Sequence, residues 1–153
     1  MFFGLVRDEK MASGPARAIR TVLVVEDEPL IAFDNERALS HAGYRIAATV
    51  GDYGHAVRVM DGEDVDLVIA DVTLHGARSG IDVARHARGK GLPVLFVTGS
   101  CPSHARDLAV GCLAKPYHPR DLIASVAVVD RMLRGRHATR LPMGLSLFAE
   151  ATI

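Results

Sequence analysis

The sequence predicts an α/β domain in which a parallel sheet carries helices on both of its faces. Short apolar runs alternate five times with longer segments that have helical periodicity. The runs are nearly unbroken, which is typical of strands buried on both faces of a parallel sheet. Polar residues follow most of the runs, and ligands of open α/β sheets bind at the carboxyl ends of the strands. Together these observations predict a doubly wound fold with a functional site along one edge of the sheet.

The first half of the chain contains two predicted strand–helix pairs. The first strand is expected over residues 21–25, followed by a helix over Pro29–His41, in which Pro29 is well suited to the first helical position. Gly43 ends this helix. A second strand over 44–50 and a helix over 52–60 complete this half.

The central apolar run, Asp66–Asp71, has β-branched residues in its middle and ends on a carboxylate. A carboxylate in that position can also cap a helix, so Asp71 alone does not indicate a reactive group. A loop follows, and Ser79 is a suitable N-cap for a helix that extends to about Lys90. The assignment of Asp71 therefore depends on the ends of the other strands.

Three further elements complete the pattern. A fourth strand is predicted over 92–97, with its proline at the start, where a strand tolerates it. A short helix over 103–110 leads to a fifth strand over 111–114, and a longer helix spans 119–133 with apolar residues at helical spacing.

Composition excludes several classes of protein. The 153 residues fit one domain, and 18 basic residues balance 18 acidic ones, so charge gives no reason to expect a nucleic-acid or membrane partner. Tryptophan is absent, and no apolar run is long enough to cross a membrane. Cys101 and Cys112 form no CxxC motif and are expected to be reduced thiols. These features predict a cytoplasmic protein.

Five polar residues follow the predicted strands: Glu26, Asp27, Asp71, Thr98 and Lys115. Parallel strands bring these residues to one edge, where three carboxylates repel one another unless a positive charge lies between them. Carboxylate oxygens with few committed positions suit Mg²⁺, which prefers partners that carry phosphate. A carboxylate beside Mg²⁺ can act as a nucleophile toward a phosphoryl group, and a lysine and a hydroxyl can neutralise the phosphoryl oxygens. The pattern therefore indicates phosphoryl transfer to Asp71.

In these motifs the sequence resembles the receiver domain of bacterial two-component response regulators. The matching segments occur in the family's order over about residues 20 to 134: Val25-Glu26-Asp27-Glu28-Pro29, Leu67-Val68-Ile69-Ala70-Asp71, Ser79-Gly80-Ile81, Phe96-Val97-Thr98-Gly99 and Leu113-Ala114-Lys115-Pro116-Tyr117. The resemblance implies a flavodoxin-like (βα)5 fold with a five-stranded parallel sheet of order 2-1-3-4-5.

The resemblance also implies a role for each site residue. Asp71 would accept the phosphoryl group, and Thr98 and Lys115 would contact it. Mg²⁺ would be held by Asp27, by Asp71 and by the main-chain carbonyl of Thr73, with Glu26 acting mainly through a metal-bound water. The Lys115–Pro116 bond would be cis. Such a protein is expected to be no enzyme beyond its self-catalysed phosphoryl transfer and slow autodephosphorylation.

The sequence departs from the family pattern after the fourth strand. The family usually has an aromatic switch residue three positions before the lysine, where this chain has Cys112, and the segment from Thr98 to Lys115 is short by about one helical turn. His75 stands where proline is common. The run Val94–Ser100 resembles the subfamily named for its PFxFATGY motif, which also lacks the switch aromatic, and Tyr117 fits that group. A fourth helix that the phosphoryl group orders or shifts is the corresponding hypothesis for signal output.

The predicted organisation is an N-terminal arm over 1–19, a receiver over 20–135 and a tail over 136–153, with no separate output domain. The arm is expected to be flexible. The tail contains an apolar stretch, 141–148, that is expected to pack on the domain, although binding to a partner or to a second subunit stays open. The expected partners are a sensor histidine kinase or phosphotransferase, an unknown downstream protein and, as a possibility, a second copy of the chain.

Three functions remain in competition. The leading one is a stand-alone receiver that signals by protein–protein contact or drains its kinase as a phosphate sink. A phosphohydrolase of the haloacid-dehalogenase type uses a similar residue set, but it needs a second aspartate two residues after the nucleophile, where this chain has Thr73. A binding module without functional phosphorylation is the third.

Overall fold

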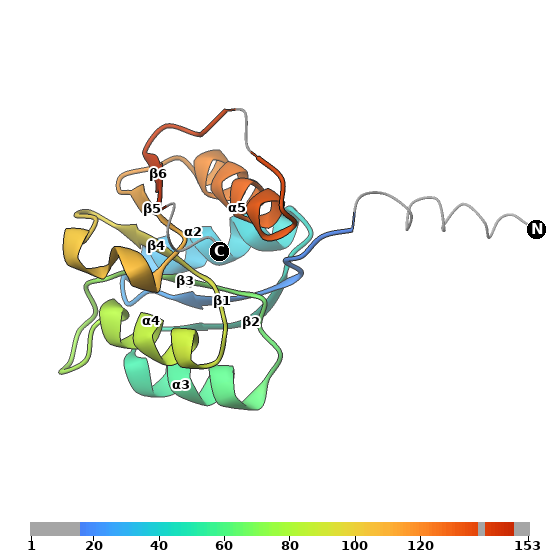
Figure 1. The fold of residues 1–153 in the computed structure, drawn as a ribbon. Coiled ribbons are helices and arrows are strands. Elements are labelled where there is room, and N and C mark those ends of the chain that lie inside the picture. The colour runs from blue at the N-terminus through green and yellow to red at the C-terminus, as the bar shows by residue number, and fades with distance from the viewer. Residues whose placement is uncertain (1–15, 138–139, 149–153) are drawn as a thin grey trace, which may run out of the picture.

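The computed structural model describes residues 16–137 and 140–148, which form a central sheet between two layers of helices (Figure 1). The sheet has six strands in the order β2-β1-β3-β4-β5-β6. The first five strands pair in parallel, and β6 pairs antiparallel with β5. The strands are β1 (Thr21–Val25), β2 (Arg45–Val50), β3 (Leu67–Ala70), β4 (Val94–Thr98), β5 (Gly111–Ala114) and β6 (Leu145–Leu147). The predicted fold class and the order of the five parallel strands are therefore confirmed.

The helices divide between the two faces of the sheet, α3 and α4 on one and α2 and α5 on the other (Figure 1). Their bounds are α2 (Pro29–His41), α3 (Tyr53–Gly62), α4 (Gly80–Gly89) and α5 (Pro119–Leu133). Each begins after a residue whose side chain accepts a hydrogen bond from the first turn: Glu28, Asp52, Ser79 and His118. None of the helices within the described residues is long and apolar enough to cross a membrane.

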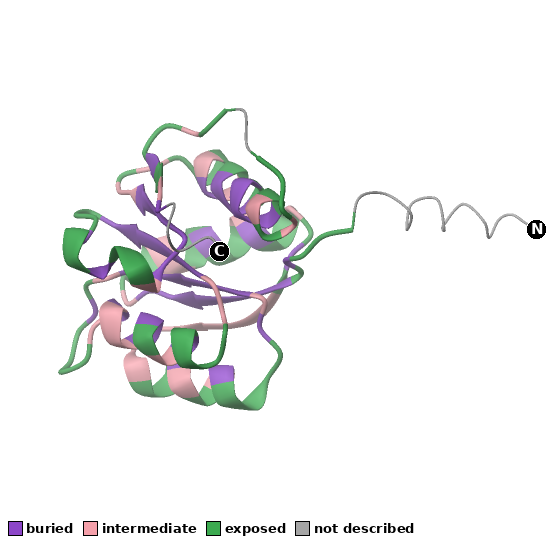
Figure 2. Cartoon of the chain, in the orientation of Figure 1, coloured by how far each residue is buried: buried purple, intermediate pink, exposed green. Residues whose placement is uncertain are grey.

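The unbroken apolar runs of the sequence are buried on both faces, as expected for central parallel strands. Every residue of β1, β3 and β4 is buried, while β2 at the edge is only partly covered (Figure 2). Leu23 and Val25 pack toward α3 and α4, and Val22 and Val24 pack toward α2 and α5. This alternation fixes which side chains meet each helix layer, and it leaves the polar strand ends at the rim of the sheet.

The segment between β4 and β5 differs from the prediction. The helix expected over 103–110 is a 3-10 helix, η1 (Ser103–Leu108), interrupted by non-helical backbone at Ala105. The segment is too short for a full α-helix between two paired strands, and a 3-10 helix spans more distance per residue.

The thiol prediction is wrong in this structure, because Cys101 and Cys112 are joined by a disulfide. The pairing of β4 with β5 brings Cys112 opposite Phe96, and the chain after β4 then turns so that the two cysteine Cα atoms lie 6.1 Å apart. That distance is within the range that a disulfide bridges. The sequence separation of 11 residues gave no sign of this proximity.

The tail packs on the domain as expected, and it does so by adding a strand. Leu145 and Phe148 are buried, and the amide of Phe148 donates to the carbonyl of Val110 over 2.9 Å. The sequence did not predict β6 because three residues are too few to show a period.

The prediction of a flexible arm over residues 1–19 is wrong for Ala18 and Ile19, which are fixed to the domain. The amides of Ala18 and Ile19 both donate to Oδ1 of Asp130 over 2.7 Å, and Ile19 is fully buried. Arg134 donates to the other oxygen of Asp130 over 2.9 Å. The prediction for residues 1–15 lies outside the described residues.

The close approach of β6 to β5 predicts the effect of one substitution. A Cβ at Gly111 would lie 2.6 Å from the main-chain oxygen of Ser146, so Gly111→Ala should lower the free energy of unfolding by about 1–3 kcal/mol. Urea denaturation followed by circular dichroism measures this loss. Gly89→Ala, where a Cβ meets nothing within 4 Å, should cause no loss.

A shortened chain ending at Gly144 provides the internal control. Without Ser146, the same Gly111→Ala change should cost clearly less than in the full chain. An equal cost in both chains would show that the contact with β6 is not its cause.

Candidate functional site

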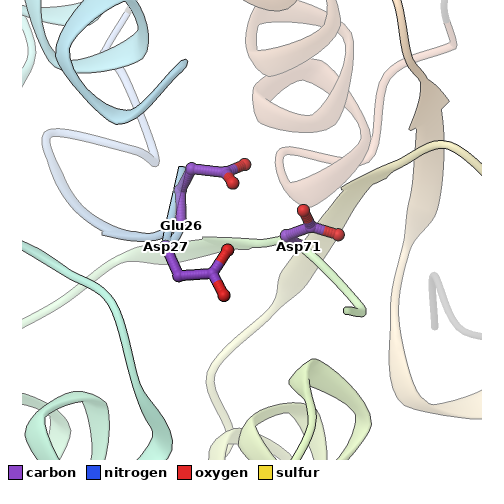
Figure 3. A group of neighbouring side chains, drawn as sticks. All are labelled: Glu26, Asp27 and Asp71. Atoms are coloured by element: carbon purple, nitrogen blue, oxygen red, sulfur yellow. The ribbon is translucent and has the colours of Figure 1, made fainter. Parts of the chain in front are cut away.

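The candidate site lies at the carboxyl ends of β1, β3, β4 and β5, on the rim where parallel strands end together. Figure 3 shows three carboxylates gathered there, Glu26 and Asp27 after β1 and Asp71 after β3. Thr98 is the last residue of β4, and Lys115 follows β5 directly. The sequence prediction that these five residues share one edge is therefore confirmed by the strand order.

Asp71 is held from both of its carboxylate oxygens. It is 6% exposed, and its Oδ1 accepts a hydrogen bond from the amide of Thr73 over 3.0 Å. Its Oδ2 accepts from Nζ of Lys115 over 2.7 Å. The amide of Asp71 donates to the carbonyl of Val25 over 3.0 Å, which ties the end of β3 to the end of β1. The carboxylate is thus fixed in orientation while its residue remains at the rim.

Lys115 lies between two carboxylates. Its Nζ donates to Oε1 of Glu26 over 3.0 Å as well as to Asp71. Its backbone is also fixed, because its amide donates to the carbonyl of Thr98 over 2.8 Å. The bond between Lys115 and Pro116 is cis, as expected. Burial disfavours the charged form of Lys115, but the hydrogen bonds to Asp71 and Glu26 outweigh burial and raise its pKa above the usual 10.5. The lysine is therefore a permanent positive charge at the centre of the acidic group.

Glu26 is the most buried acid of the cluster, with its side chain 1% exposed. Burial raises the pKa of Glu26 above its usual 4.5, and the hydrogen bonds from Lys115 and from the amide of Glu28 oppose this shift only in part. The nearby charge of Asp71 raises it further. Ionised Glu26 therefore costs the folded protein stability in the absence of an additional cation.

Asp27 is held from a different direction. Its Oδ2 accepts from the amide of His75 over 2.7 Å, and the same oxygen is paired with the His75 ring. The ring itself is 92% exposed, as expected for a solvated loop histidine. The sequence did not predict the contact with Asp27, because the two residues lie 48 positions apart in the chain.

The residues fit a divalent cation. Glu26, Asp27 and Asp71 each offer an oxygen, and these three oxygens lie within 4.8 Å of one another. An all-oxygen set of this kind suits Mg²⁺, which keeps several of its waters. Thr73 contributes its amide to Asp71, whereas the predicted role of its carbonyl as a metal ligand stays a prediction.

Thr98 is buried, with 2% of its surface exposed. The residue after it, Gly99, has open space around it, because a Cβ at that position would meet nothing within 4 Å. The role of the Thr98 hydroxyl toward a phosphoryl group stays a prediction.

Gly80 is a residue whose role the sequence did not specify. A Cβ at this position would lie 1.9 Å from the carbonyl oxygen of Asp71, so the first turn of α4 meets the backbone of Asp71 with no space for a side chain. The amide of Gly80 donates to the carbonyl of Val72 over 2.8 Å. In the sequence, Ser79 indicated a helix start and Ser79-Gly80-Ile81 matched the family pattern, but neither signal gave the reason for a glycine at position 80.

A second contact that the sequence did not predict joins α2 to the chain after Lys115. The hydroxyl of Tyr117 donates to Oδ1 of Asn35 over 2.9 Å, and Asn35 is buried. This bond fixes the position of Tyr117 beside the site.

Comparisons of the sequence with known proteins all point to the same family. The response regulator receiver domain matches residues 22–127. The chain is 35% identical over 121 residues to the transcriptional regulatory protein PdtaR of Mycobacterium tuberculosis, which covers 75% of this chain and 58% of PdtaR. It is 36% identical over 130 residues to the transcriptional regulatory protein TcrA of the same organism, covering 77% of this chain and 51% of TcrA. The chain thus spans little more than half the length of these relatives.

Solved structures show the same fold. A LuxR-family two-component response regulator from Aurantimonas superposes with a TM-score of 0.67 at 26% identity, over 79% of this chain and 89% of that one. The signal receiver domain of a modulated diguanylate cyclase from Desulfovibrio desulfuricans G20 gives a TM-score of 0.64 at 30% identity, over 71% and 91% of the two chains.

The raised pKa of Glu26 predicts a pH-dependent effect of Glu26→Gln without divalent cations. The fold favours the protonated acid, so this contribution to stability is present below pH 4.5 and is lost as the pH rises through the raised pKa. Glutamine stays neutral and avoids the loss. Relative to the unchanged protein, Glu26→Gln should therefore gain stability from acidic to neutral pH, measured by urea unfolding in EDTA.

Glu36→Gln serves as the control, because Glu36 is an exposed glutamate on α2. Its effect on the unfolding free energy should stay near zero throughout. The prediction would be contradicted if the gain in unfolding free energy of Glu26→Gln over the unchanged protein were independent of pH or became smaller toward neutral pH.

Proposed function

The chain belongs to the response regulator receiver family, and from that premise we propose that it is a stand-alone receiver that accepts a phosphoryl group on Asp71. The donor would be a sensor histidine kinase or a phosphotransferase, and the reaction would depend on Mg²⁺. The observation that supports this most directly is the contact of Asp71 with Lys115 at 2.7 Å, inside a cluster of three carboxylates.

The geometry around Asp71 supports its role as a nucleophile. A carboxylate oxygen forms a bond to phosphorus while the bond from phosphorus to the donor breaks, and the donor leaves with its electron pair. Lys115 is within hydrogen-bond distance of the attacking group and can neutralise negative charge on the transferred oxygens. The amide of Thr73 keeps the carboxylate in a defined orientation.

The acidic cluster would hold the metal through Glu26, Asp27, Asp71 and the carbonyl of Thr73. When bound, Mg²⁺ supplies positive charge to the phosphoryl oxygens. Asp27 is kept in place for this role by the amide of His75. Glu26 is almost fully buried and accepts a hydrogen bond from Lys115. It would therefore help to position both the lysine ammonium group and the metal ion.

We propose that the output is a protein–protein contact, or alternatively the draining of phosphoryl groups from a kinase. Residues 145–147 return to the sheet as β6, so this part of the tail belongs to the receiver fold. PdtaR and TcrA are named as transcriptional regulators and are longer than this chain. We further propose that this protein acts in the cytoplasm, without a separate output domain and without contact to nucleic acid. We also assign it, as part of the same proposal, to the PFxFATGY group.

Intact mass after incubation with phosphoramidate and Mg²⁺ tests the role of Asp71. The unchanged protein should gain one phosphoryl group, and Asp71→Asn should gain none because it lacks the nucleophile. Lys115→Met should react about 100-fold more slowly, since it loses the charge that neutralises the phosphoryl oxygens. Asp64→Asn, at an exposed position outside the site, should react like the unchanged protein.

The other outcomes identify the competing functions. Release of many phosphates per chain, without a stable adduct, would support a phosphohydrolase. Absence of any adduct on the unchanged protein would contradict the proposal and favour a binding module.

Removal of the metal should lower thermal stability. At a Mg²⁺ concentration ten times the Kd, binding adds about 1.4 kcal/mol to the free energy of unfolding, which corresponds to a rise of about 3 to 6 °C in Tm. Asp27→Asn should lose most of this rise because it loses a ligand, and EDTA should reverse the rise in the unchanged protein. Equal rises in the unchanged protein and in Asp27→Asn would show that the ion binds elsewhere, and Asp64→Asn again provides the control.

A further inference from the structure

We propose that Cys101 and Cys112 form a reversible redox site, oxidised by hydroperoxides and reduced by dithiols, that fastens the segment between β4 and β5 to the sheet. The two residues are joined by a disulfide in the structure, with Cα atoms 6.1 Å apart. They are the only two cysteines of the 153 residues, so either one can form an intramolecular disulfide only with the other.

The two cysteines differ in burial. Cys101 lies in the exposed loop after β4, whereas Cys112 lies within β5 and is fully buried. An exposed thiol can meet an oxidant or a reductant in solution, and a buried thiol can react only with what its neighbours present to it. This arrangement suits a pair in which Cys101 reacts first and Cys112 resolves the product.

The chemistry balances with a hydroperoxide as the oxidant. The Cys101 thiolate attacks the terminal oxygen of the hydroperoxide, the O–O bond breaks, and Cys101 becomes a sulfenic acid while the hydroperoxide leaves as an alcohol or water. The Cys112 sulfur then attacks the Cys101 sulfur, the S–O bond breaks, and water leaves as the disulfide forms. A dithiol returns both thiols by exchange and itself becomes a disulfide.

The disulfide adds a covalent restraint to a segment whose inner side packs on the core through Ala105 and Ala109. Residues 99–110 contain η1, a 3-10 helix that is broken at Ala105. Side-chain contacts of the segment include an exposed ion pair, Arg88 with Asp107 at 2.9 Å, and Arg106 above the ring of Phe148 at 4.7 Å. Exposed ion pairs contribute little to stability, so the disulfide is the main restraint on the exposed part of the segment around Cys101.

The segment also joins two residues of the candidate site. Cys101 comes three residues after Thr98, and Cys112 comes three residues before Lys115. The amide of Lys115 donates to the carbonyl of Thr98, so the hydrogen bond and the disulfide restrain the same pair of strand ends. The redox state of the pair therefore determines how firmly the connection between these strand ends is held.

The test uses the full chain, first reduced with dithiothreitol and then treated with hydrogen peroxide. After denaturation and alkylation, intact mass should show two alkyl groups on the reduced chain and none on the oxidised chain, and a second dithiothreitol treatment should restore both. Amide hydrogen exchange in residues 99–110 should be about tenfold slower in the oxidised chain. Exchange in α2, on the opposite face of the sheet from η1, should not change.

The variant Cys101→Ser provides the matched control, because residue 101 is exposed and the change removes only the reactive sulfur. It should exchange like the reduced protein under both treatments. Retention of two alkylable thiols after peroxide, or a covalent dimer on a non-reducing gel, would overturn the proposed site. Equal exchange of residues 99–110 in the oxidised and reduced chains would overturn its role in fastening the segment.

Discussion

The ammonium group of Lys115, placed between Glu26 and Asp71, is the interaction on which the rest of the site depends. Its Nζ lies 3.0 Å from one carboxylate and 2.7 Å from the other. Without this charge, three acids within a few ångströms would repel one another, and nothing would offset the burial that raises the pKa of Glu26 except the amide of Glu28. Lys115 thus lets the folded chain keep its acids together before a metal binds.

The parallel sheet brings these three side chains together without any special loop structure. Glu26, Asp71 and Lys115 come from three different strands, and each needs only to be the first polar residue after a buried run. Backbone hydrogen bonds then set their relative positions, from Asp71 to Val25 and from Lys115 to Thr98. Gly80 completes the arrangement because only a glycine lets α4 begin against the carbonyl of Asp71.

Much of the fold and the composition of the site could be predicted from the sequence, because both depend on local patterns. Buried strands show as unbroken apolar runs, and the strand order places their polar ends together. Features that depend on distant partners could not be predicted in the same way. The contact of His75 with Asp27 and the disulfide between Cys101 and Cys112 arise from loop paths that no periodicity describes.

The C-terminal tail also combines a feature that local sequence predicts with one that depends on a distant partner. An apolar tail that packs on the domain can be inferred from the exposed area it would otherwise leave. The mode of packing, as a three-residue strand, follows from an open hydrogen-bonding edge on β5, which the tail residues themselves do not encode. Gly111 is the residue that leaves room for this approach.

The position of β6 has a consequence for the solubility of the protein. A parallel sheet that ended at β5 would present a row of unpaired amides and carbonyls, which is a template for strand addition by another molecule. Pairing with β6 satisfies β5 and moves the open edge to a strand of only three residues, too short to recruit a neighbour efficiently. The final strand therefore acts as protection against aggregation, in addition to its contribution to packing.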